Sequence, residues 1–160
     1  MEFDWIVFGV FISACCAAAA TGSMFPPDKW YDALRKPSWN PPNWVFPVVW
    51  SILYIVIAVA ATRVAVLDGN ALAMAFWGLQ IALNTLWSPV FFGLNRIKAG
   101  MFIIVALWLA VCGAMVSAWQ IDMVAGLLLA PYLVWVSIAA ALNAAVWRLN
   151  PDKAGGPATA

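Results

Sequence analysis

Histidine is absent from this 160-residue chain. Without imidazole, the chain lacks the commonest metal ligand, the usual proximal haem ligand and the commonest general base. The three cysteines, Cys15, Cys16 and Cys112, lie inside apolar runs, where thiols usually behave as small hydrophobic side chains, and adjacent cysteines rarely pair with each other. We therefore expect no metal site, no required cofactor and no disulfide framework.

Charge is also scarce. Only 9% of the residues are charged and 66% are hydrophobic, with a mean hydropathy of +0.91, whereas soluble domains are roughly 25% charged and 45–50% apolar. The net charge of +1 and the absence of a basic run exclude an electrostatic surface for nucleic acid. The composition predicts an integral membrane protein with one domain, residues 1–150, and a disordered tail, residues 151–160.

Apolar runs of the length that crosses a membrane, about 20 residues, occur five times. The first is predicted to be a retained span, because acidic Glu2 and Asp4 precede it where a signal peptide carries basic residues. The predicted fold is an all-α bundle of five transmembrane helices with a long, structured first loop. The five runs are Phe3 to Thr21, Trp44 to Val66, Ala71 to Phe92, Met101 to Trp119 and Val124 to Trp147.

The basic residues divide unequally between the two sides of this bundle. One side has only Arg63, close to the end of the second span. By the positive-inside rule, the richer side, with the first loop and the C-terminus, faces the cytoplasm if the protein sits in a bacterial inner membrane; an outer membrane stays open. The basic residues of that side are Lys29, Arg35, Lys36, Arg96, Lys98, Arg148 and Lys153.

The first loop and the start of the second span, residues 30–50, hold four of the eleven tryptophans and four of the ten prolines. Asp28 is a predicted N-cap of a short helix that Pro37 ends, and Asn43 a predicted N-cap of the second span. Proline and tryptophan make a stiff loop. Two interpretations stay open: tryptophans resting at headgroup level, or a lid formed by Tyr31 and the segment 39–42, which contains Trp39 and Pro41.

Helical periodicity places aromatic side chains on facing stripes of the second and fifth spans. Asn143 flanks the stripe of the fifth span. Tryptophans also lie deeper than an interfacial belt explains, at positions 50, 77, 87, 108 and 135. The two stripes are Trp50, Tyr54, Ile57 and Ala61, and Trp135, Ala139, Leu142 and Val146.

The third span has two opposite faces. Gln80, Asn84, Trp87 and Phe91 share one, and amides at membrane depth are costly in lipid, so this face should point into the bundle. The amides serve either a ligand or a structural hydrogen bond. The other face either packs within the chain or forms a homodimer interface; it consists of Ala71, Ala75, Gly78 and Ala82.

Small residues also recur along the first span, at Gly9, Ser13 and Ala17. Their four-residue spacing predicts a face on which a neighbouring helix approaches closely.

Four motifs in order resemble the TspO/MBR family, the tryptophan-rich sensory proteins related to the mitochondrial translocator protein. They are WYDALRKPSWNPP, Trp50 with Tyr54, LNTLWSPVFF, and PYLVW followed by Ala139, Leu142 and Asn143, and the resemblance covers residues 3–150. It implies a five-helix bundle, commonly dimeric, that binds porphyrins such as protoporphyrin IX, sterols and synthetic isoquinoline or benzodiazepine drugs. The implied pocket lining is Tyr31, Pro41, Trp50, Tyr54, Asn84, Trp87, Trp135, Ala139, Leu142 and Asn143.

Three functions are compatible with this resemblance. One is a receptor or sensor that binds porphyrins for regulation or transport, with Lys29, Arg35 or Lys36 meeting the porphyrin carboxylates. Another is an enzyme that degrades porphyrin in light, with Trp50 and Trp135 as redox partners. The last is a sterol- or lipid-binding stress scaffold, for which only weak sterol recognition is expected, because Ala144 stands where animal relatives carry a tyrosine.

Overall fold

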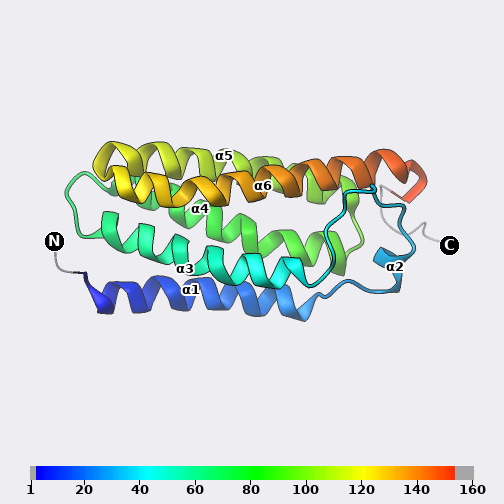
Figure 1. Ribbon diagram of the computed structural model, residues 1–160, viewed down its shortest axis with the longest axis horizontal. Coiled ribbons are helices and arrows are strands. Elements are labelled where there is room, and N and C mark those ends of the chain that lie inside the picture. Colours follow the sequence, from blue (N-terminus) through cyan, green and yellow to red (C-terminus); the bar gives the residue numbers. More distant parts are fainter. Residues whose placement is uncertain (1–2, 154–160) are drawn as a thin grey trace.

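The computed structural model describes residues 3–153, which form a bundle of long helices (Figure 1). Four helices are long and apolar enough to cross a membrane: α1 (Trp5–Met24), α3 (Val45–Ala65), α5 (Ile97–Ile121) and α6 (Met123–Leu149). A further helix, α4 (Ala71–Ser88), continues into one π-helical turn, η1 (Pro89–Gly93). The chain is therefore an all-helical membrane protein, as the composition predicts.

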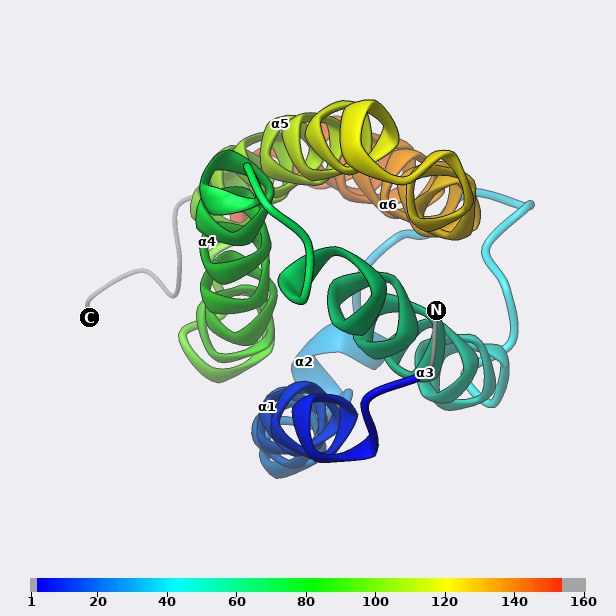
Figure 2. The same cartoon turned by 90° about the vertical axis from the view of Figure 1, so that its left-hand side faces the viewer.

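The long helices pack as a ring. Seen end-on in Figure 2, each contacts its neighbours in the order α1, α3, α6, α5, α4 and back to α1. The first loop lies at one end of this bundle with the C-terminal end of α6, while the first turn of α1 lies at the other end (Figure 1).

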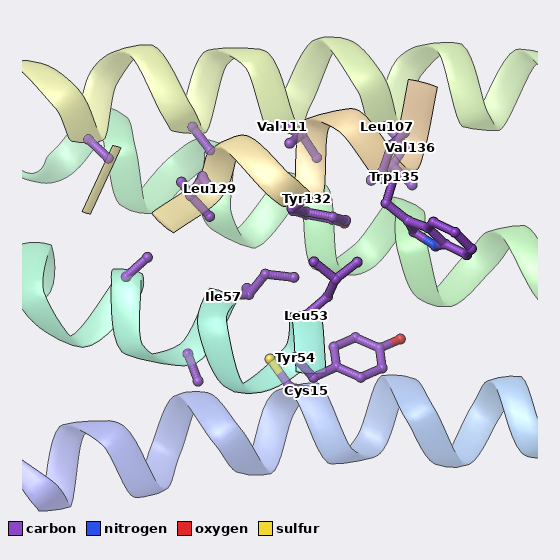
Figure 3. Close-up of a cluster of buried hydrophobic side chains, with 14 of the residues drawn as sticks. Cys15, Leu53, Tyr54, Ile57, Leu107, Val111, Leu129, Tyr132, Trp135 and Val136 are labelled. Atoms are coloured by element: carbon purple, nitrogen blue, oxygen red, sulfur yellow. The ribbon is translucent and has the colours of Figure 1, made fainter. Parts of the chain in front are cut away.

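The core lies inside the ring and contains side chains from all five long helices. Figure 3 labels members from α1, α3, α5 and α6. Fully buried side chains such as Ile57, Val111 and Tyr132 meet there. At the end of the bundle away from the first loop, Arg63 forms an ion pair with Asp122 at 2.7 Å, and Asp122 also caps the first turn of α6. This contact joins the end of α3 to the start of α6.

The prediction for the first helix is wrong. Ser13 and Ala17 are exposed, and Gly9 has open space beside it, whereas α1 buries Cys15 and Ala18. The hydroxyl of Ser13 donates to the carbonyl of Gly9 in the same helix at 2.7 Å, so this face needs no polar partner from a neighbouring helix.

The first loop contains the expected short helix, α2 (Lys29–Asp32), and the Asp28 side chain accepts from the Tyr31 amide at its start. The prediction for Asn43 is wrong, because α3 is capped by Trp44, and Asn43 makes no capping bond in the described chain. Counted from Trp44 as the N-cap, Pro47 is the third residue of α3, whose N–H group an N-cap side chain often binds. Proline has no N–H group, so this capping bond cannot form.

Asn150 fixes this loop to the end of α6. Its side-chain oxygen accepts from the Arg35 amide at 2.9 Å, and its side-chain nitrogen donates to the Arg35 carbonyl at 2.9 Å and the Val146 carbonyl at 2.8 Å. Asn150 is 7% exposed, so water competes little for these groups. Beyond it, Pro151–Lys153 form a 3₁₀ turn, and the rest of the predicted disordered tail lies outside the described residues.

We predict that Asn150→Ala frees the loop from α6. The substitution removes three hydrogen bonds, each worth about 1 kcal/mol net, and leaves the Arg35 amide without its acceptor. Hydrogen exchange measured by mass spectrometry should become at least about tenfold faster over residues 33–36. Asn43→Ala, in an exposed asparagine of the same loop, is the control. Unchanged exchange in Asn150→Ala would contradict the role of this contact.

Candidate ligand-binding cavity

A cavity of about 500 Å³ lies at the loop end of the bundle. All five long helices contribute to its wall, and residues of the first loop, including Tyr31 and Asn40, contribute to its lining. Nine of the side chains predicted from the sequence line it together: Tyr31, Trp50, Tyr54, Asn84, Trp87, Trp135, Ala139, Leu142 and Asn143. Their role in ligand binding stays a prediction.

The other two predicted residues of the lid lie elsewhere. Trp39 is 51% exposed, and neither Trp39 nor Pro41 belongs to the described lining. The loop reaches the cavity through Tyr31 and Asn40 instead, and the Asn40 side chain donates to the Pro41 carbonyl at 3.0 Å.

Burial raises the pKa of the Tyr31 phenol above its ordinary value, because the ionised form would lose hydration. Tyr31 therefore stays neutral.

The π-helical turn builds the wall beneath Tyr31. Pro89 offers no N–H group to the preceding turn, and the helix continues with a wider bond from the Leu94 amide to the Pro89 carbonyl at 2.9 Å. The Phe91 ring stacks on Trp87 with centroids 4.8 Å apart, and the Phe92 ring lies 5.3 Å from Tyr31. The wide turn thus joins α4 to the loop through aromatic contacts.

The opposite wall comes from α3 and α6. The ring of Trp50 lies 5.4 Å from Tyr54 and 6.0 Å from Tyr132, and Trp135 lies 5.7 Å from Phe46. Trp135 is 8% exposed, whereas Trp50 is half-buried. Figure 3 shows Tyr54 and Trp135 on facing helices. Trp50 and Tyr54 from the first predicted stripe, and all four residues of the second, therefore line the same cavity, whereas Ile57 and Ala61 do not belong to its lining.

Polar side chains cross the floor of the cavity. The Tyr54 hydroxyl donates to Asn84 Oδ1 at 2.8 Å, Asn84 Nδ2 donates to the Tyr132 hydroxyl at 3.2 Å, and that hydroxyl donates to Gln80 Oε1 at 2.8 Å. Both amides of the third span are buried, as predicted, and both bond across helices. Asn84 also lines the cavity. Its position is therefore compatible with both roles that the sequence left open, a structural hydrogen bond and a contact with a ligand.

Asn143 is held by the start of α5. Its Nδ2 donates to the Ile97 carbonyl at 3.1 Å. A Cβ at Gly100 would lie 2.8 Å from the Phe91 ring and 3.2 Å from Asn143 Oδ1. Glycine is therefore required for this close approach of α5 to two lining residues.

The sequence interpretation missed further lining residues, among them Phe46 and Ala18. It also missed Tyr132, which bonds to Asn84 but does not belong to the lining. Tyr132 lies three residues before Trp135 and shares its face, so the same periodicity identifies it. Phe46 lies one turn before Trp50. Ala18 and its neighbours in α1 also line the cavity, and small residues carry no sequence signal that separates cavity lining from helix packing.

The basic residues lie around the loop rather than in the described lining. The ammonium of Lys36 lies 4.5 Å from the centroid of the Tyr31 ring and bonds the carbonyls of Asp32 and Leu34. Lys29 and Arg35 are exposed. A ligand with an anionic edge would therefore meet these cations above the cavity.

Comparisons with known proteins give matches over most of this chain. The model of the TspO/MBR family matches residues 11–148. Protein CrtK of Rhodobacter capsulatus is 52% identical over 151 residues, which cover 92% of this chain and 94% of that protein. The tryptophan-rich sensory protein of Cereibacter sphaeroides is 47% identical over 94% of this chain and 95% of its own length. The human translocator protein is 32% identical over 80% of this chain and 79% of its own length.

Proposed function

This chain belongs to the TspO/MBR family of integral membrane proteins, and we propose that it is a receptor or sensor that binds a porphyrin of the protoporphyrin IX type beneath its first loop. Relatives named as sensory and translocator proteins support a membrane sensor or receptor. The observation that carries the porphyrin proposal is the cavity of about 500 Å³ that Trp50 and Trp135 both line. Small-molecule sites typically measure about 300–1,000 Å³ and combine apolar walls with few polar groups.

The chemistry of a porphyrin matches the walls. Its aromatic plane would stack between Trp50 and Trp135, and its polar ring atoms would bond Tyr54, Asn84 or Asn143. Its carboxylates would extend past the loop toward Lys36, with Lys29 and Arg35 nearby in sequence. Without histidine for axial ligation, we propose that the ring binds metal-free.

We propose that α4 with η1 is a fifth crossing of the membrane. Together they span residues 71–93 and run within the same ring as the four more apolar helices. The lower hydropathy of α4 comes partly from Gln80 and Asn84, whose side chains are buried inside the bundle rather than exposed to lipid. The basic loop end then faces the cytoplasm if the protein sits in an inner membrane.

We also propose a homodimer through the outward face of α4. Ala71, Ala75 and Ala82 are exposed, and a Cβ added to Gly78 would meet no described atom within 4 Å. This face is therefore not used for packing within the described chain. Small residues allow two such helices to approach closely in a membrane.

We predict saturable binding of protoporphyrin IX, measured in the dark by quenching of tryptophan fluorescence. Trp50→Phe and Trp135→Phe should each weaken binding by about three- to tenfold, because a smaller ring loses stacking area. Trp44→Phe is the control, since Trp44 is 67% exposed and lies outside the described lining. Absence of saturable binding by the wild type would overturn the proposal.

Illumination separates binding from degradation in the same samples. A receptor should retain the absorbance of its bound porphyrin. Loss of absorbance in light that depends on Trp50 and Trp135 would instead show the porphyrin-degrading reaction.

We predict that Gly78→Phe lowers the dimer fraction in lipid nanodiscs or vesicles by at least about tenfold, because the ring would separate the two helices. Energy transfer between labelled copies measures this fraction. Gly9→Phe is the matched control, since Gly9 also has open space beside it but lies on α1. An unchanged dimer in Gly78→Phe would exclude this face as the interface.

A further inference from the structure

Gln80 lies behind the cavity and is connected to it through other side chains. It is 2% exposed and does not belong to the cavity lining, and its Nε2 has no hydrogen-bond acceptor among the described residues. An unpartnered amide N–H₂ group at this depth is costly. Its Oε1, in contrast, ends the chain of bonds that begins at Tyr54.

The three hydrogen bonds that link Tyr54, Asn84, Tyr132 and Gln80 all run in one direction, from Tyr54 toward Gln80. Tyr54 gives its only proton to Asn84, and Tyr132 gives its only proton to Gln80. A phenol has one donor and two lone pairs. With its proton used, the Tyr54 oxygen offers only a lone pair to a ligand in the cavity.

The same side chains allow the opposite direction. The side-chain amides of Gln80 and Asn84 can each rotate so that their oxygen and nitrogen atoms exchange positions. Gln80 Nε2 then donates to Tyr132, Tyr132 donates to Asn84 Oδ1, and Asn84 Nδ2 donates to Tyr54. The number of bonds is unchanged. Tyr54 then has its proton free for a ligand, and Gln80 has one N–H group and its carbonyl oxygen without a partner in place of two N–H groups.

We propose that Gln80 is a specificity-determining residue of this cavity, because its amide sets whether Tyr54 presents a lone pair or a proton to the ligand. The inference rests on the proposed ligand-binding function. In the direction that the structure shows, Tyr54 accepts from a ligand N–H group, such as a pyrrole of a metal-free porphyrin. A ligand with a carbonyl or ring-nitrogen acceptor at this edge requires the reversed direction.

The test uses two flat tricyclic probes of similar size. Carbazole has an N–H donor, and acridine, at a pH where it is neutral, has a ring-nitrogen acceptor. In Gln80→Met, the Tyr132 proton has Asn84 Oδ1 as its only strong acceptor, because a thioether sulfur accepts weakly, so the hydrogen bonds favour the reversed direction. We expect the ratio of the carbazole Kd to the acridine Kd to rise about tenfold over the wild type, the effect of one hydrogen bond.

Three variants control this measurement. Leu79→Met introduces the same side chain at a position 49% exposed, and should leave the ratio unchanged. Tyr54→Phe removes the hydroxyl group that meets the ligand. Adding Gln80→Met to Tyr54→Phe should therefore leave the ratio of the two Kd values unchanged. Tyr132→Phe removes the hydroxyl that connects Gln80 to Asn84, so adding Gln80→Met to it should leave the ratio unchanged. Gln80→Leu, which also removes the amide, should raise the ratio as Gln80→Met does and keeps the test informative if Gln80→Met fails to fold.

The outcomes separate this inference from the proposed function. An unchanged ratio in folded Gln80→Met and Gln80→Leu overturns the role of Gln80, even if both variants bind protoporphyrin IX. A shifted ratio in a protein that binds no protoporphyrin supports the role of Gln80 and overturns the porphyrin. If Tyr54→Phe changes neither Kd, the probes do not meet Tyr54 and the inference fails.

Discussion

An amide buried between helices has little water with which to bond, and this constraint orders the bundle. Gln80 and Asn84 bury their side chains between helices and bond to tyrosines of α3 and α6. These bonds fix the rotation of α4 about its axis. The same rotation places Trp87 on the cavity wall and leaves the small residues of α4 outside, so the cavity and the proposed dimer face depend on one polar cluster.

The loop end depends on a different kind of contact. Asn150 binds both backbone groups of Arg35, and Tyr31 packs against the aromatic rings of the π-helical turn. Loop, α4 and α6 are therefore joined around the cavity. Because α6 also carries Trp135 and Asn143, movement of the loop would be transmitted to the lining through the Asn150 contact.

The helix positions, and the inward faces of the second, third and fifth spans, could be predicted from the sequence. A membrane span needs a long apolar run, and an amide exposed to lipid is costly. The facing stripes of Trp50 and Trp135 followed from the same periodicity. Two features could not be predicted because they depend on contacts between distant segments. One is the side of the loop that meets the cavity, which carries Asn40 and not Trp39 or Pro41. The other is the pairing of Asn150 with Arg35. Likewise, the small residues of α1 and α4 have the same pattern, and neither pattern packs against another helix of the described chain.

The central claim is that a porphyrin binds inside the bundle, beneath the first loop. A structure determined with protoporphyrin IX bound tests it most directly. The account predicts the ring between Trp50 and Trp135, with its carboxylates toward Lys36. The account would be contradicted by a ring on the outer face of α3 and α6, in the shallow apolar groove beside Ile52, Pro131 and Ile138, with the inner cavity unchanged.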